Sequence, residues 1–203
     1  MTSRLSSVRD VAAALNVQGA HGLMFGALML AIGAPTLLAG GSVFDWGRYA
    51  RDAIALGEWW RLVSCHFVHF DRAHALANLL GFVLVWSLVA RTLSVRQWLL
   101  CIVCSIGAVS AGLWWLSPRV QWYVGASGFL HGLLICGAVV AARSRDRLAW
   151  LVLLIVAAKL GYEQWSGALP FSGEMLVVTD AHLYGAVGGL LAAMLLRGRG
   201  APL

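Results

Sequence analysis

The chain has 203 residues, of which 60% are hydrophobic and only 12% are charged, and its formal net charge is +6. About a quarter of the residues of a soluble domain are usually charged, so this composition excludes an ordinary soluble protein and predicts one membrane domain with several spans. The positive charge does not require a nucleic acid partner, because basic residues gather at the cytoplasmic ends of membrane spans.

The first segment, residues 1–22, contains two arginines but no clear small-residue cleavage site before the first apolar run. We therefore expect a retained cytoplasmic leader and not a cleaved signal peptide. Six apolar segments follow, at about residues 23–38, 62–90, 98–116, 127–142, 148–165 and 181–196. The sequence thus predicts an all-α membrane protein with six transmembrane helices, followed by a short basic cytoplasmic tail, residues 197–203.

The outer loop between the first two apolar segments combines aromatic and charged residues. It contains Trp46, Tyr49, Trp59 and Trp60 beside arginines and acids. Tryptophan and tyrosine favour the headgroup region, and an amphipathic segment can lie in the plane of the interface. We predict a folded interfacial loop half-embedded in the outer leaflet; the alternative is a mobile, solvated loop.

The arginines orient the six segments. Nine of them fall on one side of an arrangement with both termini inside: Arg4, Arg9, Arg91, Arg96, Arg143, Arg145, Arg147, Arg197 and Arg199. Cytoplasmic loops carry an excess of arginine and lysine. This excess therefore predicts an integral membrane protein with both termini in the cytoplasm. We expect the membrane to be a bacterial inner membrane, with the opposite helix ends toward the periplasm.

Polar residues gather near the outer ends of the second, fourth and sixth segments. They are His69, His74, Asn78, Ser127, His131 and His182. Polar side chains inside spans are costly and usually face the bundle interior or a water-filled cavity. Each of them alone has an ordinary structural explanation, but Ser127, His74, Asn78 and His182 lie at the same depth, which predicts a shared site.

Small residues accompany these polar groups. Ser127 lies in the stretch GASG, and three glycines follow His182, namely Gly185, Gly188 and Gly189. A small-residue face allows two helix backbones to approach closely, which would bring His182 within hydrogen-bond reach of Ser127. Serine is a weak nucleophile until a base takes its proton, and histidine can do so near neutral pH.

Three motifs in this order resemble those of the rhomboid intramembrane serine proteases. They are Gly125-Ala126-Ser127-Gly128, the H-x4-H-x3-N spacing of His69, His74 and Asn78, and Ala181-His182 followed by Gly185. Trp60-Arg61 also resembles the W-R signature of the family's first loop. The resemblance extends over about residues 57–196. It implies a six-helix catalytic domain, residues 23–196, with a water-accessible cavity open to the outer side.

The resemblance also implies roles for the residues. Ser127 would attack a peptide carbonyl, and His182 would be the general base of a Ser–His dyad without an acidic third member. The backbone N–H of Ser127 and the side chains of His74 and Asn78 would form the oxyanion hole. Supporting roles fall to His69, Gly125, Gly128, His131 and Gly185.

Two of the neighbouring residues need comment. His131 stands where many rhomboids have a tyrosine, and it could stack on His182 or form a hydrogen bond with it. His69 would shape the water-bearing rim of the cavity. Asp180 precedes His182 by two residues and therefore points to a different helix face, so no acid near the histidine is evident.

The compact chain and the stretches CHFVHFDRAHALANLLGF and GASGFLHG most resemble the rhombosortase subgroup. This resemblance implies an endopeptidase that cleaves membrane-anchored protein substrates in the lipid bilayer, near the outer face, and processes C-terminal Gly-Gly-type sorting tails. No cofactor, metal or nucleic acid partner is expected. The sequence does not indicate an oligomeric state.

Two other functions are compatible with parts of the sequence. A membrane haem or metal protein would use the histidines, namely His66, His69, His74, His131 and His182. These histidines lack carboxylates or cysteines at a convincing ligand spacing. A non-catalytic relative that binds membrane helices would not need both a serine and a histidine at the same depth. Proteolysis is therefore the preferred hypothesis.

Overall fold

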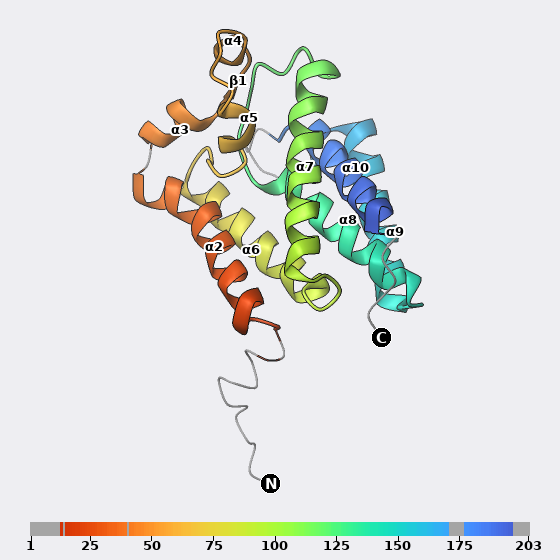
Figure 1. Ribbon diagram of the computed structural model, residues 1–203. Coiled ribbons are helices and arrows are strands. Elements are labelled where there is room, and N and C mark those ends of the chain that lie inside the picture. Colours follow the sequence, from red (N-terminus) through yellow and green to blue (C-terminus); the bar gives the residue numbers. More distant parts are fainter. Residues whose placement is uncertain (1–12, 14, 40, 171–176, 197–203) are drawn as a thin grey trace.

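The computed structural model describes residues 13, 15–39, 41–170 and 177–196, which are mostly helical (Figure 1). Most of the expected leader and the whole expected tail lie outside these residues. Four of the nine arginines that orient the sequence lie outside them as well, namely Arg4, Arg9, Arg197 and Arg199. The five remaining arginines lie in or beside the α6–α7 and α8–α9 turns, and Figure 1 shows both turns at the same end of the bundle.

Six long helices correspond in order to the six apolar segments. They are α2 (Gly19–Ala39), α6 (Arg72–Val89), α7 (Val95–Trp115), α8 (Ser127–Arg143), α9 (Arg147–Ser166) and α10 (Thr179–Leu195). Within the described ranges, four helices are long and apolar enough to cross a membrane, namely α2, α6, α7 and α9. Helices α8 and α10 have 17 residues each. This confirms the prediction of a mainly helical membrane protein with several spans.

The second helix begins later than its apolar segment predicts. Asp71 precedes α6 and accepts a hydrogen bond from the His74 backbone N–H at 2.7 Å, which caps the helix. Asp is a favoured N-cap because its side chain satisfies one of the free N–H groups of the first turn. The preceding residues form the short helix α5 (Arg61–Ser64) and a turn. The histidine motif therefore begins in a turn and continues into a helix.

The loop between α2 and α6 is folded, as its composition predicts. It contains α3 (Gly41–Gly47), strand β1 (Tyr49–Ala50), α4 (Arg51–Ala55) and α5. The Arg61 guanidinium is 8% exposed and donates to the carbonyls of Asp45 and Arg48 and to the Glu58 carboxylate. A guanidinium with this many acceptors fixes the surrounding backbone. This network disfavours the alternative of a mobile loop.

The same loop is tied to the segment that leads into α8. Strand β1 pairs antiparallel with β2 (Trp122–Tyr123), so the fold is not strictly all-α. The Arg51 guanidinium donates to four carbonyls at and after the end of α7, those of Leu113, Trp114, Ser117 and Val120. Carbonyls at a helix C-terminus lack intrahelical donors, and a cation satisfies them well.

Helices α8 and α10 contact each other through their backbones. A Cβ atom built on Gly185 would overlap the Gly128 carbonyl, and one on Gly189 would overlap the Gly132 carbonyl. Gly188 faces α7 in the same way, since its Cβ would overlap the Cys104 carbonyl. The glycines that the sequence analysis singled out therefore permit the closest helix contact of the bundle, as small-residue faces do in membranes.

Candidate active site

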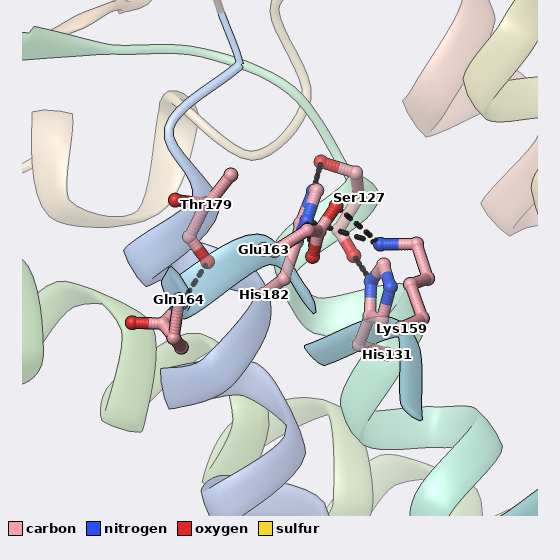
Figure 2. A network of polar contacts seen from close by, with 7 residues as sticks. All are labelled: Ser127, His131, Lys159, Glu163, Gln164, Thr179 and His182. Carbon is pink, nitrogen blue, oxygen red and sulfur yellow. Dashed lines mark hydrogen bonds and ion pairs between the residues drawn. The ribbon is translucent and has the colours of Figure 1, made fainter. Parts of the chain in front are cut away.

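Ser127 and His182 face each other across the α8–α10 contact. Ser127 is the first residue of α8, and His182 lies in the first turn of α10. The Ser127 Oγ atom lies 3.0 Å from His182 Nε2 (Figure 2). Only 6% of His182 is exposed. A productive nucleophile–base contact falls in the range of about 2.6–3.2 Å, so no rearrangement is required for proton transfer.

The turn before Ser127 depends on glycine. Gly125 has a φ of +114°, a conformation that other residues rarely adopt. A Cβ atom at this position would lie 2.9 Å from His74 Nε2. The Gly125 carbonyl accepts a hydrogen bond from the buried Tyr123 hydroxyl at 2.7 Å, and its N–H donates to Cys65 O at 2.8 Å. Gly125 thus allows the α8 entry to pass close to α6.

His74 and Asn78 lie on α6 beside this turn. Asn78 Nδ2 donates to the His74 carbonyl at 3.0 Å, as expected of residues one helical turn apart. Both side chains line the same cavity as Ser127. The first N–H groups of a helix have no intrahelical acceptors and form the positive end of its dipole. The start of α8 and these two side chains can therefore converge on a developing negative charge.

The cavity has a volume of about 520 Å³ and a mainly apolar lining. It is bordered by α6, α8, α9 and α10, and by residues around β2. Its ionisable and hydrogen-bonding side chains include His74, Asn78, Ser127, His131, Lys159, Glu163 and His182. Apolar pockets with a few convergent polar groups are the usual form of a small binding site.

The His131 ring stacks on the His182 ring. The His131 and His182 rings have centroids 4.3 Å apart and planes at 20° (Figure 2). His131 Nδ1 lies 2.7 Å from the Ser127 carbonyl, and because a carbonyl can only accept, this nitrogen is the donor. His131 therefore supports both members of the pair from one side.

His69 lies behind His74 rather than at a rim. It is 1% exposed, its ring contacts His74 edge-on at 5.1 Å, and its backbone N–H donates to Thr36 Oγ1 at 2.9 Å. Burial, and secondarily the nearby His74, lower the pKa of His69 to about 3, so its ring is neutral at physiological pH. The expected position at a water-bearing rim is wrong, and the contacts indicate a supporting role.

Sequence reasoning missed two charged residues of the site. Glu163 Oε2 lies 2.9 Å from His182 Nδ1, and Glu163 Oε1 accepts from Lys159 Nζ at 2.6 Å (Figure 2). The expectation that no acid reaches His182 is therefore wrong. Asp180 is turned away, as expected, and accepts a hydrogen bond from Ser117. The missed signal was a lysine and a glutamate four residues apart inside an apolar segment, where ionisable residues usually have a function.

The five histidines do not form one metal or haem site. His66 is fully buried, and its Nε2 lies 3.3 Å from Ser110 Oγ. Among the described residues, His131, Glu163 and His182 have ligand atoms within 4.8 Å of one another. The Lys159 ammonium already occupies one Glu163 oxygen and would repel a divalent cation at short range. This donor set fits a proton-transfer network better than a metal centre.

The sequence of the chain is similar to known proteins. Residues 56–199 match the family model described as "Rhomboid domain". Similar curated proteins include those named Rhomboid protease GlpG from Salmonella newport (strain SL254), Salmonella typhi and Salmonella typhimurium. Each is 28% identical over an alignment of 167 residues, which covers 79% of this chain and 56% of the relative. The chain thus spans little more than half the length of these relatives.

Proposed function

This chain belongs to the rhomboid family, and from that premise we propose that it is an intramembrane serine endopeptidase that cleaves membrane-anchored proteins. The observation that carries the proposal is the 3.0 Å contact between Ser127 Oγ and His182 Nε2 beside an apolar cavity. Both residues also line the cavity, so a peptide bound there could reach Ser127 Oγ.

The reaction follows from the contacts. His182 Nε2 accepts the proton of Ser127 Oγ while Oγ forms a bond to the scissile carbonyl carbon, which gives a tetrahedral oxyanion and an imidazolium. When the carbon–nitrogen bond breaks, the imidazolium returns that proton to the leaving amine. Water then attacks the acyl-enzyme with the same histidine as base, which releases the second product and restores Ser127.

The oxyanion would be bound by the backbone N–H of Ser127 and the side chains of His74 and Asn78. All three residues line the cavity, Ser127 from the start of α8 and His74 and Asn78 from α6. Donors that are already oriented cost no reorganisation when charge develops, and each contributes about 2.7–4 kcal/mol.

Substrates would enter sideways between α6 and α9, which border the cavity. A transmembrane helix satisfies its own backbone hydrogen bonds and must unwind locally before a peptide bond reaches Ser127. Segments with glycine or proline near the outer face of the membrane should therefore be preferred. Replacement of these residues by leucine in a model substrate is expected to slow cleavage.

We further propose six spans, with α8 and α10 as the two short inner ones, and an outer-facing site in a bacterial inner membrane. The described turns that carry arginine lie at the end of the bundle opposite α3 and α4 (Figure 1), which supports this topology. The rhombosortase assignment, with cleavage of C-terminal Gly-Gly-type sorting tails, rests on the two sequence stretches around the site.

The test uses the full chain in liposomes with a model single-span substrate and a fluorophosphonate probe. Ser127→Ala should abolish both cleavage and labelling while insertion is retained. Ser87→Ala is the matched control, since Ser87 is exposed on α6 and donates to Leu84 O of its own helix. A Ser127→Ala protein that still cleaves would contradict the proposal. Absence of labelling and cleavage in the wild type would favour a non-catalytic helix-binding protein.

A further inference from the structure

The Glu163 carboxylate is almost completely enclosed within the bundle. It is 3% exposed, and its two oxygens contact two different partners, His182 Nδ1 at 2.9 Å and Lys159 Nζ at 2.6 Å. Glu163 and Lys159 are one turn apart on α9, whereas His182 is on α10. A buried carboxylate is costly unless it is paired, so its position beside the histidine requires a reason.

The contact with Glu163 determines where His182 carries its proton. An ionised carboxylate can only accept, so Nδ1 is the donor at 2.9 Å. The unprotonated Nε2 then faces Ser127 Oγ, as a general base must. Lys159 Nζ is also 3.4 Å from Nδ1, but two donors cannot bond to each other, and its contact with Glu163 is much shorter.

We propose that Glu163 is a positioning residue that completes a Ser127–His182–Glu163 triad, and that Lys159 keeps this carboxylate ionised within the membrane. The inference rests on the proposed protease function. Glu163 holds the productive tautomer and ring orientation, and its negative charge stabilises the imidazolium that forms when Ser127 loses its proton. The carboxylate keeps its own charge throughout, and the proton on Nδ1 does not move.

The rival explanation is a purely structural ion pair within α9. The two explanations differ in the outcome of removing both charges together. Replacement of both members of a buried pair is often nearly neutral for stability, whereas removal of one leaves the other unpaired. The double variant Lys159→Met/Glu163→Leu, which replaces the pair by apolar side chains, should therefore fold well, yet it lacks an acceptor for Nδ1–H. In Glu163→Gln the amide can donate to Nδ1, which favours the unproductive tautomer.

The experiment measures kcat, KM, thermal unfolding and the rate of fluorophosphonate labelling for the full chain in liposomes. Glu163→Gln and the double variant should both lose at least about 100-fold in kcat, toward the roughly 10⁴-fold known for loss of a triad carboxylate, with little change in KM. Labelling should slow in parallel. Glu163→Asp, which keeps the charge on a shorter side chain, should recover part of kcat.

Gln164→Ala is the matched control. Gln164 is adjacent to Glu163 but exposed, and it points away from His182 and donates to Thr179 O at 3.4 Å (Figure 2). It should retain wild-type kcat. If the double variant is as stable and as active as the wild type, Glu163 is structural and the triad is wrong. If Ser127→Ala also cleaves, the protease function itself is wrong, so the two failures are distinguishable.

Discussion

Two interfaces of α10 build the site in different ways. Toward α8, glycines bring the two backbones into contact, which sets the distance between Ser127 and His182. Toward α9, His182 contacts the long side chain of Glu163, which also binds Lys159, beside a small apolar patch. Ser127 and His182 are thus held by backbone contact between two helices, while the charged groups beside His182 are side chains of α9, which also borders the cavity.

The largest loss of cleavage should come from a substitution that separates α8 from α10. In Gly185→Val the new side chain would overlap the Gly128 carbonyl, so α8 and α10 must separate. Overpacking of this kind costs about 1–3 kcal/mol, and a displacement of about 1 Å can lower the rate about 100-fold. We expect cleavage to fall to background, measured with the model substrate, together with a lower unfolding temperature.

The control for this change lies on the other helix. Gly161 of α9 has no atom within 4 Å of a built Cβ, so Gly161→Val should retain cleavage and stability. Equal losses of cleavage in Gly185→Val and Gly161→Val would show that the backbone contact between α8 and α10 has no special importance for the site.

A second prediction concerns the α6 wall of the cavity. Asn78→Ala should lower kcat by about 100- to 1000-fold, since one oxyanion donor contributes about 2.7–4 kcal/mol. KM should change little, because the interaction forms only in the transition state. Leu80→Ala, at a site that is 72% exposed on the same helix, should leave both constants unchanged. A large rise in KM for Asn78→Ala would instead indicate substrate binding.

A third prediction concerns a substitution that weakens the packing of α9 against α10 and leaves Ser127 and His182 unchanged. Leu160 is 8% exposed and packs with Val156 and Ala186 between α9 and α10. Leu160→Ala should lower stability by about 2–3 kcal/mol. The loss in kcat should be roughly tenfold or less, because α8 still fixes Ser127 against His182. Leu154→Ala, exposed on the same helix, is the control. A loss as large as that of Gly185→Val would remove the distinction between the interfaces.

The smallest effect should come from His131. His131→Phe keeps a ring that can stack on His182 but removes the hydrogen bond to the Ser127 carbonyl. One hydrogen bond contributes about 1 kcal/mol net, so a roughly fivefold decrease in kcat is expected. A decrease beyond 100-fold would show that His131 takes part in proton transfer.

Much of the architecture could be predicted from hydropathy, because each apolar segment contains one long helix. The close approach of α8 and α10 could be predicted too, because glycines repeated on one helix face leave no side chains to keep a neighbouring backbone away. The contact between Ser127 and His182 followed from that approach, although the catalytic roles of both residues stay predictions.

The remainder could not be predicted for physical reasons. The sequence indicates that Lys159 and Glu163 can form an ion pair, because they lie four residues apart in α9. It does not indicate which neighbouring helix their side chains face, because apolar residues surround α9 almost evenly. The pairing of β1 with β2 joins residues more than 70 positions apart, and two-residue strands have no recognisable pattern. The late start of α6 depends on the Asp71 side chain, which caps the helix, and hydropathy does not register an N-cap.

The location of the acid on α9 has a pharmacological consequence. In the proposed triad, a lipid or drug that binds between α9 and α10 would separate Glu163 from His182 and leave Ser127 chemically intact. Such an inhibitor would need neither a reactive warhead nor any likeness to a peptide.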